Sequence, residues 1–221
     1  MITSNVIHRV FRIRYGDSEG TGFTVEVAGK EYLVTAKHVV AALDGKETIS
    51  IFSNGGWSHL EVILVGHSPE DADISVLAAA RILTPQGLPM EASNGGLIYG
   101  QDVYFLGFPY GFTGRFIFQE GGYPLPFVKK AIVSLLDHKI VLLDGHNNPG
   151  FSGGPVIFTD RSNNFKVAAV ISGFRAVEEP VLIRGENSGF TYKYNTGIIV
   201  AHLVNGTMDL IQSNPIGHRV A

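Results

Sequence analysis

The sequence predicts an all-β protein, and three observations lead to this prediction. Short segments in which apolar and polar residues alternate recur along almost the whole chain, as in half-buried strands. Gly, Pro or Asn bounds most of these segments, and the chain contains 27 Gly and 10 Pro, which supply tight turns. Only residues 201–212 have a helical pattern. A chain of 221 residues suits one large β domain or two lobes of about 100 residues each.

The first half of the chain contains six or seven of these predicted strands. Residues 6–15 alternate apolar and basic side chains, and residues 23–27 alternate cleanly. Residues 28–30, with the sequence Ala-Gly-Lys, predict a hairpin turn into a strand at 32–35. A short helix-compatible run follows at 39–43. Further strands are predicted at residues 48–52, 60–65, 74–78 and 102–106.

A segment rich in Gly and aromatic residues, 107–122, is predicted to carry the chain from a first lobe, 1–108, to a second lobe, 109–221. The second lobe continues the strand pattern and ends in the helix at 201–212, which Gly206 weakens. Its strands are predicted at residues 115–118, 128–136, 139–143, 155–158, 166–172, 181–184 and 196–200.

Composition argues against several classes of function. The net charge is -3 and no basic run is longer than Lys129-Lys130, so we predict neither a nucleic-acid partner nor a membrane partner. No segment resembles a signal peptide or a membrane span, which predicts a cytoplasmic protein or the product of upstream processing. The absence of cysteine excludes disulfides, cysteine nucleophiles and thiolate metal sites. The histidines outside the motifs described below lack metal-ligand spacing, so we predict no metal and no cofactor. The oligomeric state stays open.

The loop at residues 148–156 is a candidate nucleophile loop. Ser152 lies between Gly150 and the pair Gly153-Gly154, and a strand-like run begins at Val156. Glycines permit a tight turn that presents backbone N–H groups to a ligand, which an oxyanion hole requires. The same pattern is also typical of an ordinary turn. A catalytic role therefore depends on whether the chain also supplies a base and a carboxylate.

His38 and Asp73 are the candidate partners of Ser152. A serine hydroxyl needs a base, usually His, and the base needs a carboxylate that fixes its tautomer. His38 follows a predicted strand, and Asp73 stands at the start of an apolar strand. Asp71 is an alternative carboxylate, but the apolar run directly after Asp73 favours Asp73.

Five segments of the chain resemble, in order, the motifs of the chymotrypsin-fold serine proteases, and most closely the protease domain of the bacterial trypsin-like and Deg (high-temperature-requirement) branch. The resemblance spans about residues 20–200. It implies two packed six-stranded antiparallel β-barrels with a short C-terminal helix, and serine endopeptidase activity on polypeptide substrates. The five segments are residues 20–23, 35–39, 73–77, 107–111 and 148–155.

The resemblance also implies a role for each site residue. Ser152 would be the nucleophile, His38 the general base and acid, and Asp73 the group that orients His38. The backbone N–H groups of Gly150 and Ser152 would form the oxyanion hole. Four further residues would bind substrate: His146 on the floor of the specificity pocket, and Ser172, Gly173 and Phe174 along the substrate backbone.

One position departs from the pancreatic members of the family. They carry an Asp directly before the serine, which pairs with a newly cleaved N-terminus, whereas this chain has Phe151. Activation by N-terminal cleavage is therefore not expected.

Several alternatives remain. The fold could be a catalytically inactive peptide-binding module if the triad or the oxyanion loop were misaligned, or a polyprotein-processing protease with the same chemistry. His146 also fits an ordinary loop histidine. A further hypothesis is that residues 111–127, which include the pair Gly121-Gly122, gate the oxyanion hole.

Overall fold

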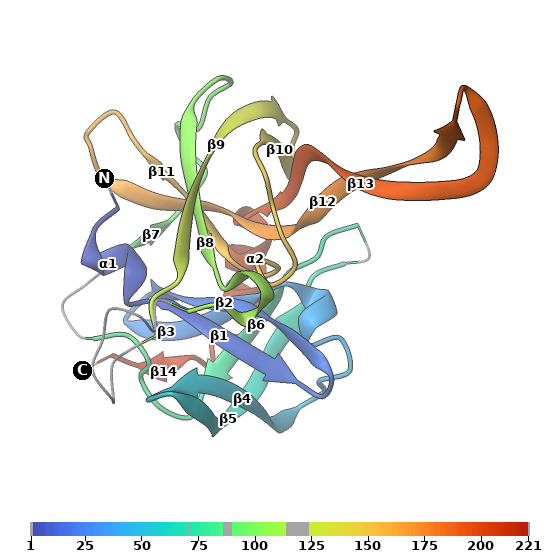
Figure 1. Ribbon diagram of the computed structural model, residues 1–221. Coiled ribbons are helices and arrows are strands. Elements are labelled where there is room, and N and C mark those ends of the chain that lie inside the picture. The colour runs from blue at the N-terminus through green and yellow to red at the C-terminus, as the bar shows by residue number, and fades with distance from the viewer. Residues whose placement is uncertain (1, 70, 86–89, 114–123, 221) are drawn as a thin grey trace.

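The computed structural model describes residues 2–69, 71–85, 90–113 and 124–220, which form two β-sheets that pack together (Figure 1). Strands dominate and helices are short, so the predicted all-β fold with a short C-terminal helix is confirmed. The strand predicted at 115–118 lies outside the described residues, as does most of the proposed gating segment.

The first sheet contains a closed six-stranded antiparallel barrel. β3 pairs with both β2 and β6, so the order β3-β2-β1-β4-β5-β6 returns to its first strand. The alternating pattern places side chains such as Ile13, Leu33 and Ile51 in a core inside this barrel. The barrel strands are β1 (Val10–Tyr15), β2 (Ser18–Val27), β3 (Lys30–Thr35), β4 (Lys46–Ser53), β5 (Gly56–His67) and β6 (Ser75–Ala79).

The second sheet repeats this arrangement. Its order is β11-β8-β9-β10-β13-β12, and pairing of β11 with β12 joins the two ends. The strands are β8 (Asp102–Gly107), β9 (Phe127–Leu136), β10 (Ile140–Asp144), β11 (Pro155–Thr159), β12 (Phe165–Ile183) and β13 (Glu186–Leu203). The short strand β7 (Glu91–Ala92) lies parallel to β12. Buried side chains from both sheets, among them Phe23, Leu106 and Ile157, form the core between them.

The chain passes between the sheets earlier than predicted. The predicted crossing lay at residues 107–122, but β7 and β8 already belong to the second sheet, so the crossing lies between Ala79 and Glu91. The reason is that β8 pairs with β9 and β11 and, among the described strands, with none of the barrel. The short strand β14 (His218–Arg219) later returns to pair with β3. The division at residue 108 into two lobes stays a prediction.

The C-terminal helix begins later than predicted. α2 spans Asn205–Ser213, whereas the helical pattern began at residue 201. Residues 201–203 belong to β13 instead, because Ala201 pairs with Val141 on one side and Ile171 on the other. The other α-helix, α1 (Ser4–Ile7), occupies the start of the strand predicted at 6–15. Neither described α-helix has the length and hydrophobicity that crossing a bilayer requires.

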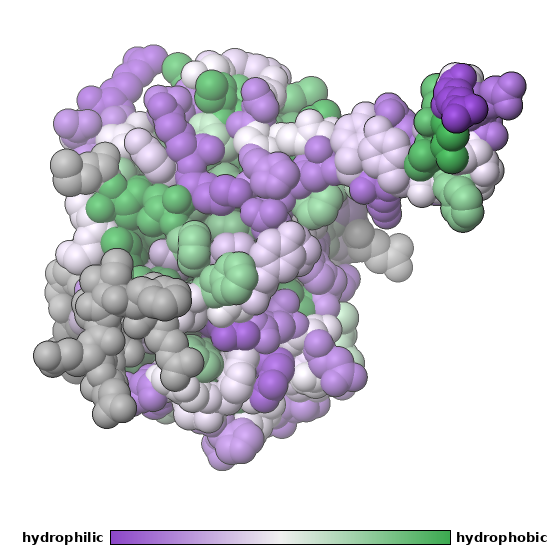
Figure 2. Space-filling view, viewed as in Figure 1, coloured by the Kyte–Doolittle hydropathy of each residue, from purple (hydrophilic) through white to green (hydrophobic). Residues whose placement is uncertain are grey.

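β12 and β13 continue as a two-stranded arm that projects from the body of the protein (Figure 1). The sequence predicted strands only at 181–184 and 196–200 in this region. Residues 186–195 cover no hydrophobic core, so they lack the buried face by which the other strands were predicted. Near its tip the arm exposes large apolar side chains, including Leu182, Ile183 and Phe190. Figure 2 shows hydrophobic and hydrophilic groups side by side at the end of the arm. The base of β12 carries the predicted substrate strand, 172–174.

Candidate active site

The barrel brings His38 and Asp73 together. His38 lies in the short 3-10 helix η1 (Lys37–Val39) after β3, and Asp73 lies just before β6. These two strand ends are neighbours because Thr35 pairs with Ser75. The His38 backbone N–H donates to Asp73 Oδ1 at 2.9 Å, and His38 Nδ1 lies 2.7 Å from Asp73 Oδ2. A carboxylate at Nδ1 favours the tautomer that leaves Nε2 free to accept a proton.

Ser172, on β12 of the second sheet, is a further partner of Asp73. Its hydroxyl donates to Asp73 Oδ2 at 2.5 Å. Sequence reasoning assigned Ser172 only to substrate binding and missed this contact. The available signal was a single hydroxyl residue that follows the fully buried run at 167–171.

The environment of Asp73 keeps its carboxyl ionised. Burial alone would raise the pKa of Asp73, but hydrogen bonds from His38 and Ser172 outweigh burial and lower the pKa to about 2. The Asp73 side chain is 19% exposed, so solvent screens these bonds only in part. Asp73 is therefore negatively charged at neutral pH.

This pKa predicts a change of stability in acid. Because the folded pKa of Asp73 lies below its unfolded value of 3.8, its contribution is complete above that value and is lost as the pH falls through about 2. We expect the difference in unfolding free energy between wild type and Asp73→Asn to shrink by about 2 kcal/mol between neutral pH and about pH 2. Denaturant unfolding at both pH values measures it, and an unchanged difference would contradict the assigned contacts.

Ser152 enters the same hydrogen-bonded group from the second sheet. It lies in the loop before β11, and its hydroxyl donates to the backbone oxygen of Ser172 at 3.1 Å. The chain of contacts therefore runs from Ser152 through Ser172 and Asp73 to His38. Among the described residues, no hydrogen bond joins the Ser152 hydroxyl to His38 in this conformation.

The backbone around Ser152 presents two donors. Within the described part of the chain, neither the Gly150 N–H nor the Ser152 N–H donates to a protein acceptor. Neighbouring groups are paired: Gly153 N–H donates to Ile171 O at 2.7 Å, and Ser152 O accepts from Thr21 N–H at 2.8 Å. Among the described residues, the two predicted oxyanion donors therefore have no protein acceptor.

The predicted substrate-binding residues fall into two groups. Gly173 and Phe174 pair with Val200 and Ile199 of β13, while the pairing of β12 with β11 ends at Val170. No described strand covers the other edge of residues 172–174, as backbone pairing with a peptide would require. His146 is exposed, and its backbone oxygen accepts from Lys129 Nζ. Its role in a specificity pocket stays a prediction.

A shallow pocket adjoins the His38–Asp73 pair. It is lined by Lys37, His38, Ala41, Asp71, Ala72, Asp73 and His202. Burial lowers the pKa of His202, although Asp73 and Asp71 oppose this effect. No group of three or more described His, Asp or Glu side chains is arranged to hold a metal ion.

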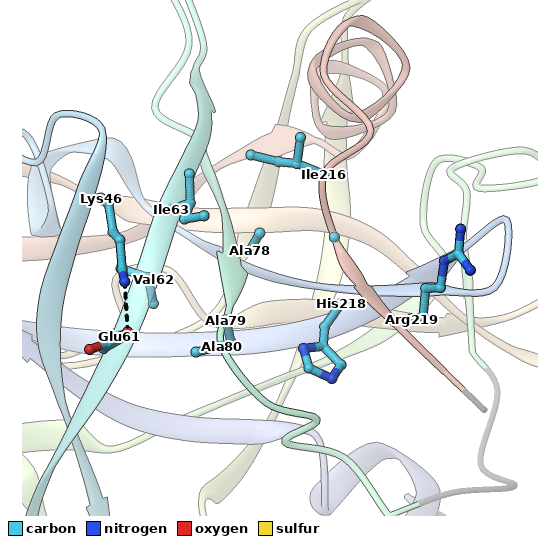
Figure 3. A pocket seen from close by; sticks show the side chains of 11 residues that line it. Lys46, Glu61, Val62, Ile63, Ala78, Ala79, Ala80, Ile216, His218 and Arg219 are labelled. Atoms are coloured by element: carbon cyan, nitrogen blue, oxygen red, sulfur yellow. Dashed lines mark ion pairs between the residues drawn. The ribbon is translucent and has the colours of Figure 1, made fainter.

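A second pocket lies where β14 packs against the barrel (Figure 3). Small side chains, Ala78 to Ala80, form part of its wall, and the Lys46–Glu61 ion pair, at 3.0 Å, lies at its side. It shares no residue with the group around Asp73.

The family model of the trypsin-like peptidase domain matches residues 20–165 of the chain. This range includes His38, Asp73, Gly150 and Ser152, and it ends before Ser172. No curated protein matches the sequence.

Solved proteases share the fold at low sequence identity. The Rv3671c protease from M. tuberculosis, in its active form, is 18% identical with a TM-score of 0.61, and the match covers 98% of this chain and 85% of that one. A Glu endopeptidase in complex with MPD is 13% identical with a TM-score of 0.61, over 96% and 94% of the two chains. The HtrA-type protease AlgW with a tripeptide is 22% identical with a TM-score of 0.60, and the match covers 95% of this chain but only 61% of AlgW.

Proposed function

The chain belongs to the trypsin-like peptidase family and is a serine peptidase, and we propose that it is an endopeptidase that acts through an acyl-enzyme on Ser152. Family membership implies polypeptide substrates. The observation that carries the proposal is the Asp73 carboxylate, which accepts from the His38 side chain and from the Ser172 hydroxyl while Ser172 contacts Ser152.

The proposed residues divide the steps of acylation among them. Ser152 Oγ attacks the carbonyl carbon of the scissile peptide, and His38 Nε2 takes the hydroxyl proton. The negative charge that forms on the carbonyl oxygen is stabilised by the N–H groups of Gly150 and Ser152. When the C–N bond breaks, His38 donates the proton to the leaving amine.

Deacylation repeats these steps with water. His38 removes a proton from the water that attacks the acyl carbon, and returns it to Ser152 Oγ as the ester bond breaks. Asp73 remains ionised throughout and stabilises the protonated imidazole. Its lowered pKa supports this role.

A non-enzymatic peptide-binding module is the second candidate. The observation in its favour is that the Ser152 hydroxyl donates to Ser172 O, so that the nucleophile and the base are not joined in this conformation. A polyprotein-processing protease would use the same chemistry and differ only in its substrate.

Fluorophosphonate labelling tests the proposal. The reagent phosphonylates an activated serine, so we expect the wild-type protein to be labelled and Ser152→Ala to be unlabelled. The exposed Ser134→Ala is the matched control and should be labelled like the wild type. Peptide binding without labelling of the wild type would favour the binding module instead. Cleavage of a diverse peptide library by the unlabelled wild-type protein then defines the substrate preference.

A further inference from the structure

The four residues before Ser152 form a tight turn with a defined orientation. Phe151 N–H donates to Asn148 O at 3.3 Å, and Gly150 has a φ of +102°. Proline at the second position and a glycine with positive φ at the third position are the signature of a type II turn. Type I and type II turns differ in the direction of their central peptide, which here joins Pro149 to Gly150.

A second segment fixes the direction of that peptide. The carbonyl oxygen of Pro149 accepts from Tyr110 N–H at 2.8 Å. Because the peptide is planar and trans, the Gly150 N–H must point to the opposite side, away from Tyr110. A side chain at Gly150 would overlap the Phe108 carbonyl oxygen, so residues 108–110 pack too closely for any residue but glycine.

Thr21 of β2 connects the same turn to the barrel. Its hydroxyl donates to Gly150 O at 2.7 Å, and its backbone N–H donates to Ser152 O at 2.8 Å. The Thr21 side chain is fully buried and also accepts from Phe108 N–H at 3.3 Å. Thr21 therefore contacts both residues whose N–H groups we assign to the oxyanion hole.

Phe151, which lies between Gly150 and Ser152 in the sequence, anchors the loop through its buried side chain. Its side chain is fully buried and packs edge-on against Phe105, with ring centroids 4.9 Å apart. Gly107 makes room for it, since a Cβ there would lie 2.7 Å from Phe151 Cδ1. Any movement of the loop that withdrew Phe151 from this contact would expose the ring to water, which is unfavourable.

We propose that these internal contacts hold the oxyanion loop permanently in its working conformation, with Thr21 and Phe151 as positioning residues. A buried aromatic ring and a threonine hydroxyl replace an ion pair to a freed N-terminus. Peptidase activity then requires neither N-terminal cleavage nor a separate activator. This inference rests on the proposed function of Ser152.

Thr21→Val and Thr21→Ser form a matched pair that tests the hydroxyl. Valine keeps the size and branching of threonine but cannot donate to Gly150 O, whereas serine can. We expect Thr21→Val to lower kcat on a peptide substrate by about 10- to 100-fold with KM within about threefold, because an oxyanion donor acts mainly in the transition state. The rate of fluorophosphonate labelling should fall in parallel, and Thr21→Ser should stay within about threefold of wild type.

A folded tag fused to the N-terminus tests independence from a free N-terminus. The tagged protein should cleave peptide and react with fluorophosphonate at the wild-type rate, before and after the tag is removed. Thermal unfolding of every variant separates lost activity from lost folding.

The outcomes separate this inference from the proposed function. An active wild type with an equally active Thr21→Val, or activity that appears only after tag removal, would overturn the positioning role while Ser152 stays the nucleophile. A wild type that is not labelled at all would overturn both proposals. Loss of kcat in Thr21→Val with recovery in Thr21→Ser supports the inference. A purely structural role would lower the unfolding temperature without lowering kcat at unchanged KM.

Discussion

Replacing Asp73 by Asn is expected to lower kcat/KM by about 10⁴-fold while the protein stays folded. The carboxylate accepts the His38 backbone N–H, the His38 side chain and the Ser172 hydroxyl. An amide has only one acceptor oxygen, and its NH₂ group would face an atom that now donates. His38 would then carry its proton on Nε2, where it could not accept the proton of Ser152. Steady-state kinetics on a peptide substrate measure this loss.

Asp71→Asn is the matched control for this variant. Asp71 lies two residues away and pairs with Lys139 at the surface. Exposed ion pairs of this kind contribute little, so kcat/KM should stay within about twofold of wild type. A loss of less than about tenfold in Asp73→Asn, or an equal loss in both variants, would show that Asp73 does not orient His38.

Gly153→Ala is expected to destabilise the protein by about 3 kcal/mol or more, which corresponds to a fall in Tm of roughly 6–12 °C. Gly153 has a φ of +84°, which disfavours any side chain. An added Cβ would also overlap the Thr21 carbonyl oxygen and the Thr35 hydroxyl, and would lie 2.8 Å from Ala36 N. These atoms belong to the barrel, so the substitution pushes the nucleophile loop away from His38. Thermal unfolding measures the effect.

Gly16→Ala isolates the backbone contribution to that loss. Gly16 also has a positive φ, +55°, but a Cβ there would meet no atom within 4 Å. Its substitution should cost only about 1–2 kcal/mol. Equal shifts of Tm in the two variants would show that the close contact at Gly153 contributes nothing to stability.

The strands of the core were predictable because their signal is local. Alternation in the segment 48–52 reflects one buried face, with Ile49 and Ile51, and one more exposed face, and the segment displays it alone. The secondary-structure prediction failed where a strand's pairing partners, rather than its own residue pattern, determined its conformation. Residues 201–203 have a helical pattern but lie between two strands, and residues 186–195 form a strand only because β12 extends beside them.

The residues of the candidate site could be predicted from the sequence, whereas several contacts between them could not. His38, Asp73 and Ser152 each stand in a motif whose residues are neighbours in sequence. The bonds from Ser172 to Asp73 and from Thr21 to Gly150 join residues 99 and 129 positions apart. A single sequence carries no signal for such a pair, since each hydroxyl alone is compatible with an ordinary strand.

The sequence by itself determined the fold class, the absence of cysteine chemistry and the candidates for nucleophile, base and carboxylate, because periodicity and motifs are properties of short segments. Tertiary structure alone decided how the loop before Ser152 is held. Phe151 departs from the pancreatic pattern, and its role depends on packing against Phe105 and on the space that Gly107 leaves for its ring. Burial and packing arise only when distant segments meet, so no local pattern could have shown that an apolar side chain takes the place of a charge.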